Sequence, residues 1–303
     1  MVPIRSRDAG FSLPEAMIAL TILLVVASIV STALLRMTEA QSTIWNRTEM
    51  HSGVRSATEL LQQEVGQAGR ITLPAAVTLS AAITTNGAQT VTVSSVVGMF
   101  VGELLAIDTG VNQETAAVTA INVANKQVTA NFIDTHPINA PVSVLGGFAT
   151  GIVPTNMANG STATVLKLYG DINGDGSMVY VEYTCDAVLG NLYRNAMAFD
   201  AGAKPAVNAS QVLLSNIQPN PGGAACFTYQ QKTVGANTYV TDVAITLTVQ
   251  TQKKDAVTKQ FQKETKALLN VSPRNVFNAW ELAGIGATNR IQPMPASVTN
   301  LLP

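Results

Sequence analysis

The sequence predicts an α+β protein in which a long N-terminal transmembrane and stem helix packs on an antiparallel β-sheet head, with a small all-β module inserted into the head. Three observations support this fold class. Residues 11–35 form an apolar run, residues 54–68 carry apolar side chains at helical spacing, and the chain from residue 88 onward alternates β-branched stretches with turn residues.

The apolar run predicts a membrane span. It extends from Phe11 to Leu35, 25 residues with a single charge. At about 1.5 Å per residue, a helix of this length crosses a bilayer with some tilt. Arg5 and Arg7 precede the run, so the positive-inside rule predicts a cytoplasmic N-terminus and a head outside the cytoplasm.

The same helix is expected to continue as a stem to about Gly66, a total length of roughly 80 Å. Apolar residues recur every three or four positions along its second half, namely Val54, Ala57, Leu61, Val65 and Ala68. Arg55 and Glu59 form an i,i+4 pair away from this stripe. Gly66 and Gly69 favour termination of the helix, with Pro74 beyond them.

Two features distinguish the N-terminus from a conventional secretory signal, whose small-residue cleavage site follows the apolar core. Here Gly10 precedes the core, and Glu15 lies near its start, where a carboxylate is costly in lipid and needs a partner. Cleavage between Gly10 and Phe11 supplies one, because it creates an ammonium group at Phe11, four residues from Glu15. The alternative is an uncleaved signal anchor with an incidental glutamate.

The motif GFSLPE at residues 10–15 resembles the class III signal of type IV prepilins and type II secretion pseudopilins. The resemblance implies that a prepilin peptidase cuts after Gly10 and methylates the amine of Phe11. It also implies that Glu15 meets the N-terminal amine of a neighbouring subunit during assembly. Pro14 departs from the commoner aliphatic residue, but a proline in the first helical turn removes no needed hydrogen bond.

These patterns divide the chain into six predicted segments. They are a prepilin leader (1–10), the transmembrane and stem helix (11–70), a connector (71–87), an inserted β module (88–148), a pilin-type β head (149–275) and an irregular C-terminal tail (276–303).

The inserted module is predicted from short strands near residues 90–93, 102–107, 114–121 and 127–132, separated by Gly, Asn or Asp turns. We expect a compact barrel, and the stretch resembles β-rich modules of bacterial surface and phage tail proteins. His136, near Pro137 and Pro141, is expected to fix a loop, since no second His or Cys accompanies it as a metal ligand. His51, on the stem, is expected to face solvent.

The head is predicted to be an antiparallel sheet. Its expected strands are 164–169, 178–184, 192–194, 239–251 and 259–270, with Val243, Ile245, Leu247 and Val249 on one face of the fourth. The pattern of Tyr183 with Leu192-Tyr193-Arg194, and of Ser272-Pro-Arg-Asn275, resembles PilW-type minor pilins and J-type pseudopilins. The length of the chain favours the PilW type.

The two cysteines, Cys185 and Cys226, predict a disulfide, because an even pair in an exported protein is usually bonded. The bond closes a loop of about 40 residues and is expected to add roughly 3–4 kcal/mol. The alternative is two buried free thiols.

Residues 171–182, DINGDGSMVYVE, fit the EF-hand loop expression. Asp171, Asn173 and Asp175 offer the oxygen ligands that Ca²⁺ prefers. The flanks are predicted strands rather than helices, and Glu182 lies too far along its strand to join them. Calcium binding by the three residues is one interpretation. The other is a polar hairpin turn whose Asp and Asn side chains bond local amides.

Composition argues against several functions. Net charge is −1 and charged residues make up 12%, which gives no global electrostatic case for nucleic acid or anionic lipid as a partner. Residues 251–290 carry seven Lys/Arg against three Asp/Glu, which we interpret as a solvated strand face. The GxSxG, HExxH, P-loop and Rossmann motifs do not occur in the sequence, so a membrane-anchored enzyme is the least favoured hypothesis.

The predicted function is therefore that of a minor pilin in a type IV pilus, contributing to its assembly, initiation or tip, with no cofactor required apart from the Ca²⁺ considered above. Expected partners are prepilin peptidase, other pilins and the inner membrane, which holds the chain in a single pass with a periplasmic head until it enters the pilus. The alternatives are a minor pseudopilin of type II secretion and a membrane-anchored adhesin that binds through residues 88–148.

Overall fold

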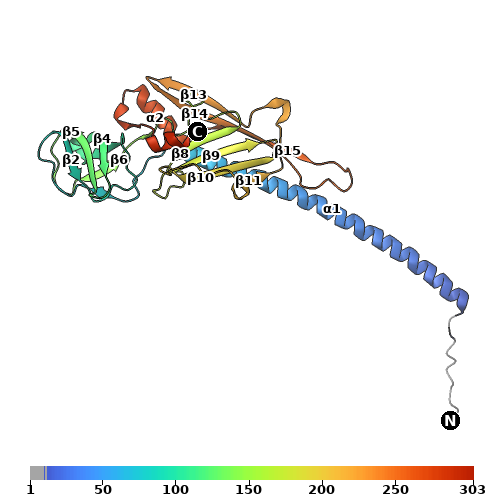
Figure 1. Cartoon of the computed structure of the whole chain (residues 1–303). Helices are drawn as coiled ribbons and strands as arrows, with labels where there is room; N and C mark the ends of the chain where they lie inside the picture. Colours follow the sequence, from blue (N-terminus) through green and yellow to red (C-terminus); the bar gives the residue numbers. More distant parts are fainter. Residues whose placement is uncertain (1–9, 11) are drawn as a thin grey trace, which may run out of the picture. The chain divides into compact units, whose positions relative to one another are not determined.

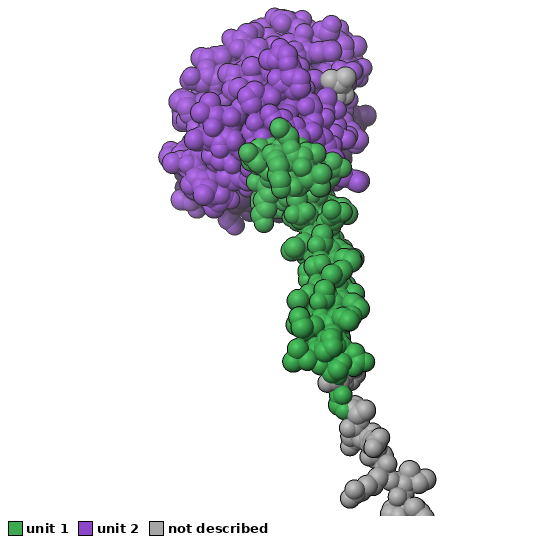
Figure 2. All heavy atoms as spheres, turned by 90° about the vertical axis from the view of Figure 1, so that its right-hand side faces the viewer, with its two compact units in different colours: residues 1–50, 251–262 green, residues 51–250, 263–303 purple. Residues whose placement is uncertain are grey.

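The computed structural model describes residues 10 and 12–303, and it confirms a long N-terminal helix followed by an antiparallel β head. Helix α1 runs from Leu13 to Gln67 over 55 residues (Figure 1). The chain forms two compact units (Figure 2). The first contains residues 1–50 and 251–262, and the second contains residues 51–250 and 263–303.

In the first unit, the N-terminal part of α1 exposes its apolar side chains. The helix is long and apolar enough to cross a membrane, and none of its most apolar window is buried within the protein. Exposed fractions of 58–62% at Ile18, Leu20 and Leu23 are typical of this surface. A helix that is apolar all round and unburied needs a non-aqueous environment.

In the second unit, the remainder of α1 packs through the predicted stripe. Its members are almost fully buried: Val54, Ala57, Leu61, Val65 and Ala68 are each at most 2% exposed. The helical spacing of these residues therefore predicted the packed face correctly. Arg55 and Glu59 form the expected ion pair on the exposed side, at 2.7 Å.

Two four-stranded antiparallel sheets form the head. The first has the order β11-β10-β9-β8, with β8 at Val165–Gly170, β9 at Val179–Asp186, β10 at Asn191–Ala198 and β11 at Val212–Ser215. The second has the order β12-β14-β13, with β15 paired to β14. Its strands are β12 at Ile217–Gln218, β13 at Phe227–Val234, β14 at Asn237–Gln250 and β15 at Lys263–Val271. Val243, Ile245, Leu247 and Val249 are all buried, as their alternation predicted.

A separate six-stranded sheet precedes the head, in the order β1-β6-β3-β4-β5-β2 (Figure 1). The strands are β1 at Val77–Thr78, β2 at Gly87–Thr92, β3 at Leu104–Ile107, β4 at Glu114–Asn122, β5 at Gln127–Phe132 and β6 at Pro141–Val144. A bridge between Leu79 and Val93 joins the ends of β1 and β2, so the sheet closes on itself around its own core. Because Leu79 and Ile83 belong to that core, residues 77–83 are part of this module and not of a connector.

The C-terminal segment corrects one prediction, since it is ordered and not an irregular tail. It contains helix α2 (Arg274–Gly284), strand β16 (Ile291–Gln292), which pairs in parallel with β7 (Gly147–Phe148), and helix α3 (Ala296–Leu301). Val276, Ala279 and Ala283 are buried at spacings of three and four. This stripe is short, and small alanines carry part of it, so it stands out weakly in the sequence. Single 3₁₀ turns lie at Gly110–Asn112, Ala209–Gln211, Pro221–Gly223 and Thr288–Arg290.

Candidate functional site

The first turn of α1 holds the predicted assembly residue, Glu15. The backbone N–H of Ser12 donates to Glu15 Oε2 at 3.2 Å, and the Ser12 hydroxyl donates to the same oxygen at 2.9 Å. Ser12 precedes the helix, and a glutamate three residues later that reaches back to its amide forms half of a capping box. Gly10 is exposed, whereas Phe11 lies outside the described residues.

The surroundings of Glu15 are apolar and open. Leu13, Met17 and Ile18 are 78%, 63% and 61% exposed. Within the described residues, the hydrogen bonds to the Glu15 carboxylate come from Ser12 alone. A carboxylate on a helix surface of this kind is costly in lipid unless a cation approaches it. The site can therefore accept an ammonium group from outside the described chain.

Comparison with known families matches this same stretch. The model of the prokaryotic N-terminal methylation motif matches residues 5–31, which contain the Gly10–Phe11 bond, Glu15 and most of the apolar run. No curated protein matches the chain. The motif, on a long exposed apolar helix followed by an antiparallel β head, supports a type IV pilin-like protein. It is equally compatible with a pseudopilin.

A second glutamate of α1 joins the helix to the head. Tyr183 donates its hydroxyl to Glu64 Oε2 at 2.5 Å, while Arg194 Nη2 donates to Glu64 Oε1 at 2.5 Å. Glu64 is 3% exposed, and burial together with its carboxylate raises the pKa of Tyr183. Tyr183 and Arg194 belong to the predicted family pattern, whereas a role for Glu64 was not predicted from the sequence. The available signal was a carboxylate three residues after Leu61, inside the apolar stripe.

The disulfide between Cys185 and Cys226 is present, with a sequence separation of 41. Cys185 belongs to β9 of the first head sheet, and Cys226 immediately precedes β13 of the second. The bond thus cross-links the two sheets.

The predicted calcium loop is the turn between β8 and β9, so strands flank it. Asp171 is fully buried, and its Oδ1 accepts the Asp175 amide at 3.1 Å; Asp175 Oδ1 accepts the Ser177 amide at 2.8 Å. Arg70 Nε lies 3.4 Å from Asp171 Oδ2. These are the contacts of the polar-turn interpretation. Calcium binding by Asp171, Asn173 and Asp175 stays a prediction.

Glu182 lies apart from that loop. Its Oε2 accepts the Tyr180 hydroxyl at 3.0 Å and the Lys204 ammonium at 2.9 Å, and Lys167 Nζ lies 3.7 Å away. The carboxylate thus serves a network inside the head, in keeping with its expected exclusion from the calcium ligands.

The two histidines occupy different environments. The His51 side chain is 56% exposed and forms an ion pair with Glu264 of β15. His136 is buried in the module, with Nε2 2.8 Å from Glu114 Oε1 and Nδ1 3.4 Å from Asp108 Oδ2. Glu114 also accepts the Ile133 amide at 2.6 Å. His136 therefore ties the β3–β4 and β5–β6 loops of the module together, as a loop-fixing residue does.

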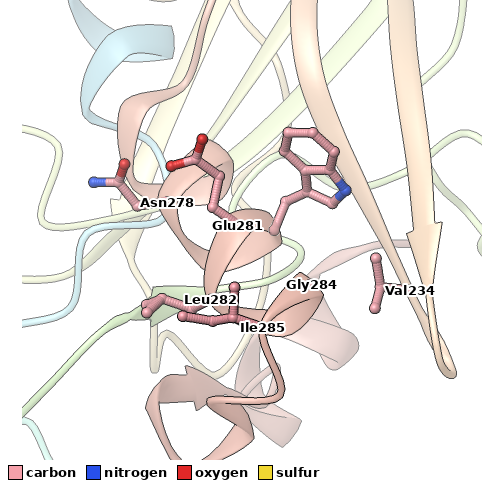
Figure 3. A pocket seen from close by; sticks show the side chains of 7 residues that line it. Val234, Asn278, Glu281, Leu282, Gly284 and Ile285 are labelled. Atoms are coloured by element: carbon pink, nitrogen blue, oxygen red, sulfur yellow. The ribbon is translucent and has the colours of Figure 1, made fainter.

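An open groove runs along α2 and is lined by Val234, Asn278, Trp280, Glu281, Leu282, Gly284 and Ile285 (Figure 3). In the close-up, Leu282 and Ile285 lie on a different side of the helix from Glu281. Glu281 is the ionisable residue among those lining it. The groove offers apolar surface rather than an arrangement of catalytic groups.

Proposed function

We propose that the chain is a PilW-like minor pilin of a type IV pilus. Prepilin peptidase cleaves it after Gly10 and methylates Phe11, and the subunit then acts in pilus assembly, initiation or at the tip. The observation that carries this proposal is the position of Glu15. Its carboxylate lies on an exposed apolar helix, four residues from the amine that cleavage creates, and inside the stretch that matches the methylation motif.

The electrostatics explain why cleavage and assembly are coupled. In the membrane, a carboxylate near the bilayer interior is retained when a cation neutralises it. In the mature chain, the new ammonium group of a neighbouring subunit supplies the cation, and an ion pair in a low-dielectric surrounding is strong. In the filament, the apolar faces of adjacent α1 helices then pack against one another in place of lipid.

The topology follows from the same segment. Arg5 and Arg7 hold the N-terminus on the cytoplasmic side, and the head faces the periplasm before the subunit enters the filament. The Cys185–Cys226 disulfide is compatible with an oxidising compartment. The expected partners are prepilin peptidase and other pilins, and the role is structural, without catalysis.

A pseudopilin of type II secretion is the nearest alternative. The inserted six-stranded module, with a core of its own, favours a pilus subunit that presents surface outside the cell. Exclusive incorporation into a periplasmic pseudopilus, with no chain in sheared surface pili, would reverse this preference.

The mature N-terminus tests the proposal first. Mass spectrometry of the purified chain should find N-methylated Phe11 as its first residue, and a chain that begins at Met1 would contradict the proposal. Glu15→Leu should insert normally but fail to enter filaments. Glu39→Leu is the matched control, because Glu39 is an exposed glutamate of α1 beyond the apolar run.

A binding role for the module is a second candidate, and it is compatible with the first. Val111, Ile133 and Ile138 are 102%, 65% and 55% exposed on the loops that His136 ties together. Replacing the three with Asn or Thr should lower attachment while filaments remain at normal numbers. Unchanged attachment would remove this candidate.

A further inference from the structure

The connection between β14 and β15 folds back on α1 in the first compact unit (Figure 2, green). We call residues 251–262 the basic hairpin. Its base closes through the Thr251 amide, which donates to the Gln262 carbonyl at 2.9 Å. Gln262 accepts a hydrogen bond from Arg47 Nε, and Gln252 donates to Glu49 Oε1 at 3.4 Å.

The hairpin points toward the apolar part of α1. Its base contacts the helix at Arg47 and Glu49, whereas Asp255, closer to the tip, lies beside Thr43. The Thr258 amide, with smaller contributions that include the Thr43 hydroxyl, lowers the pKa of Asp255. The contacts thus move toward the N-terminus of the helix as the hairpin extends. Thr43 follows the end of the apolar run by eight residues, about 12 Å along the axis.

The hairpin has the chemistry of a membrane-surface contact. Lys253, Lys254 and Lys259 are exposed, Val257 is 79% exposed and Phe261 is 40% exposed. The Lys254 ammonium lies 5.6 Å from the centroid of the Phe261 ring. Ammonium groups next to apolar side chains are typical of segments that lie among lipid headgroups.

The distance between the hairpin and the membrane surface around α1 is small. Asp255 lies beside Thr43, residues 256–258 follow it in the hairpin, and a lysine side chain is several ångströms long. Attraction to an anionic leaflet acts over a Debye length of about 8 Å at physiological salt. The lysines that composition alone assigned to a solvated strand face therefore lie near the level at which α1 leaves the hydrocarbon.

We propose that the basic hairpin binds the anionic phospholipid headgroups of the membrane that α1 spans, and so holds the subunit at a fixed height before assembly. The inference rests on the proposed membrane anchoring of α1. The occupant is lipid because the hairpin continues the same surface that the span presents to the bilayer and carries the complementary charge. Entry into a filament then releases the hairpin from the headgroups.

Depth measurements with spin labels test the proposal on the full chain in phosphatidylcholine vesicles, with or without 30% phosphatidylglycerol. The native cysteines are bonded, so labels at Leu23→Cys, Val257→Cys and Gly235→Cys report the span, the hairpin tip and a distant exposed turn. With phosphatidylglycerol, the Val257 label should lose collisions with a water-soluble nickel reagent by about threefold, while the Gly235 label stays unchanged.

Charge reversal provides the matched comparison. Lys253→Glu, Lys254→Glu and Lys259→Glu together should return the Val257 label to the accessibility of the Gly235 label. The same reversal at exposed Lys232, Lys263 and Lys266 should leave it protected. If the Leu23 label lies inside the bilayer but the Val257 label is as accessible to the nickel reagent as the Gly235 label, the hairpin contact alone is overturned. A Leu23 label in water overturns the anchoring, and the hairpin contact with it.

Discussion

Helix α1 carries two glutamates in opposite situations. Glu64 is 3% exposed, and both of its carboxylate oxygens are bound by Arg194 and Tyr183 of the head. Glu15 lies among exposed apolar side chains, and its hydrogen-bond partner among the described residues is Ser12, which immediately precedes the helix. Of the two carboxylates on this helix, that of Glu64 thus has a cationic partner within its own chain, whereas that of Glu15 has none among the described residues.

The difference separates folding from assembly. A buried carboxylate with a complete set of partners stabilises the protein that contains it, because removing one partner exposes the other to an uncompensated environment. A carboxylate whose partner is missing from its own chain contributes little to folding and instead favours association with a chain that supplies the cation. Four substitutions or additions sharpen this comparison.

The largest effect is expected at Glu64. Glu64→Ala leaves Arg194 without a counter-ion and the Tyr183 hydroxyl without its acceptor, so the free energy of unfolding should fall by about 3 kcal/mol. Denaturant titration followed by circular dichroism measures it. Glu59→Ala is the control, since Glu59 pairs with Arg55 on the exposed side of the same helix. Equal losses in the two variants would show that burial of Glu64 is irrelevant.

Glu103 is a buried carboxylate with an incomplete set of partners. It is fully buried; Oε2 accepts the Phe100 amide at 3.3 Å, and Oε1 has no hydrogen-bond partner among the described residues. Burial raises its pKa to about 8, against a small opposing effect of that amide. Between pH 4.5 and 8 the folded chain therefore holds a proton that the unfolded chain has released.

The contribution of Glu103 to stability is therefore greatest below pH 4.5 and falls as the pH rises to about 8, by at most ~1.4 kcal/mol per pH unit. Glu103→Gln keeps the shape and cannot ionise, so its stability should exceed that of the wild type by about 2 kcal/mol more at pH 6.5 than at pH 5. Unfolding titrations at the two pH values measure this. If the wild type and Glu103→Gln lost stability equally as the pH rises, the raised pKa of Glu103 would be contradicted.

The loop predicted to bind calcium is intermediate, because Asp171 is buried and paired with Arg70 but its Oδ2 lacks a hydrogen bond among the described residues. If the loop binds Ca²⁺, a concentration of ten times the dissociation constant should stabilise the chain by about 1.4 kcal/mol. Thermal unfolding with Ca²⁺ or a chelator measures it, and Asp175→Asn should abolish the response. The control Asp186→Asn, in the β9–β10 turn, should leave the response to Ca²⁺ unchanged. An unresponsive wild type would leave the polar turn as the explanation.

Local periodicity accounts for what the sequence predicted well. The stem stripe, the alternation in β14 and the turn between β8 and β9 each depend on neighbours within about ten residues, and all three are present. The ion pair of Glu64 with Arg194 joins positions 130 residues apart, which no local pattern encodes. Helix α2 was missed for another reason, because the Ser272–Asn275 pattern was interpreted as a family cue and the start signal at Pro273 was overlooked.

The smallest effect on stability is expected at Glu15, where the comparison with Glu64 is most direct. Glu15→Ala removes half of a capping box on an exposed first turn, and no side chain of the head bonds to Glu15 among the described residues. The unfolding midpoint of the full chain in detergent should therefore match that of the wild type, while incorporation into filaments is lost. A clear fall in the midpoint would mean that the carboxylate has a partner within its own chain, and the requirement for a neighbouring amine would then no longer follow.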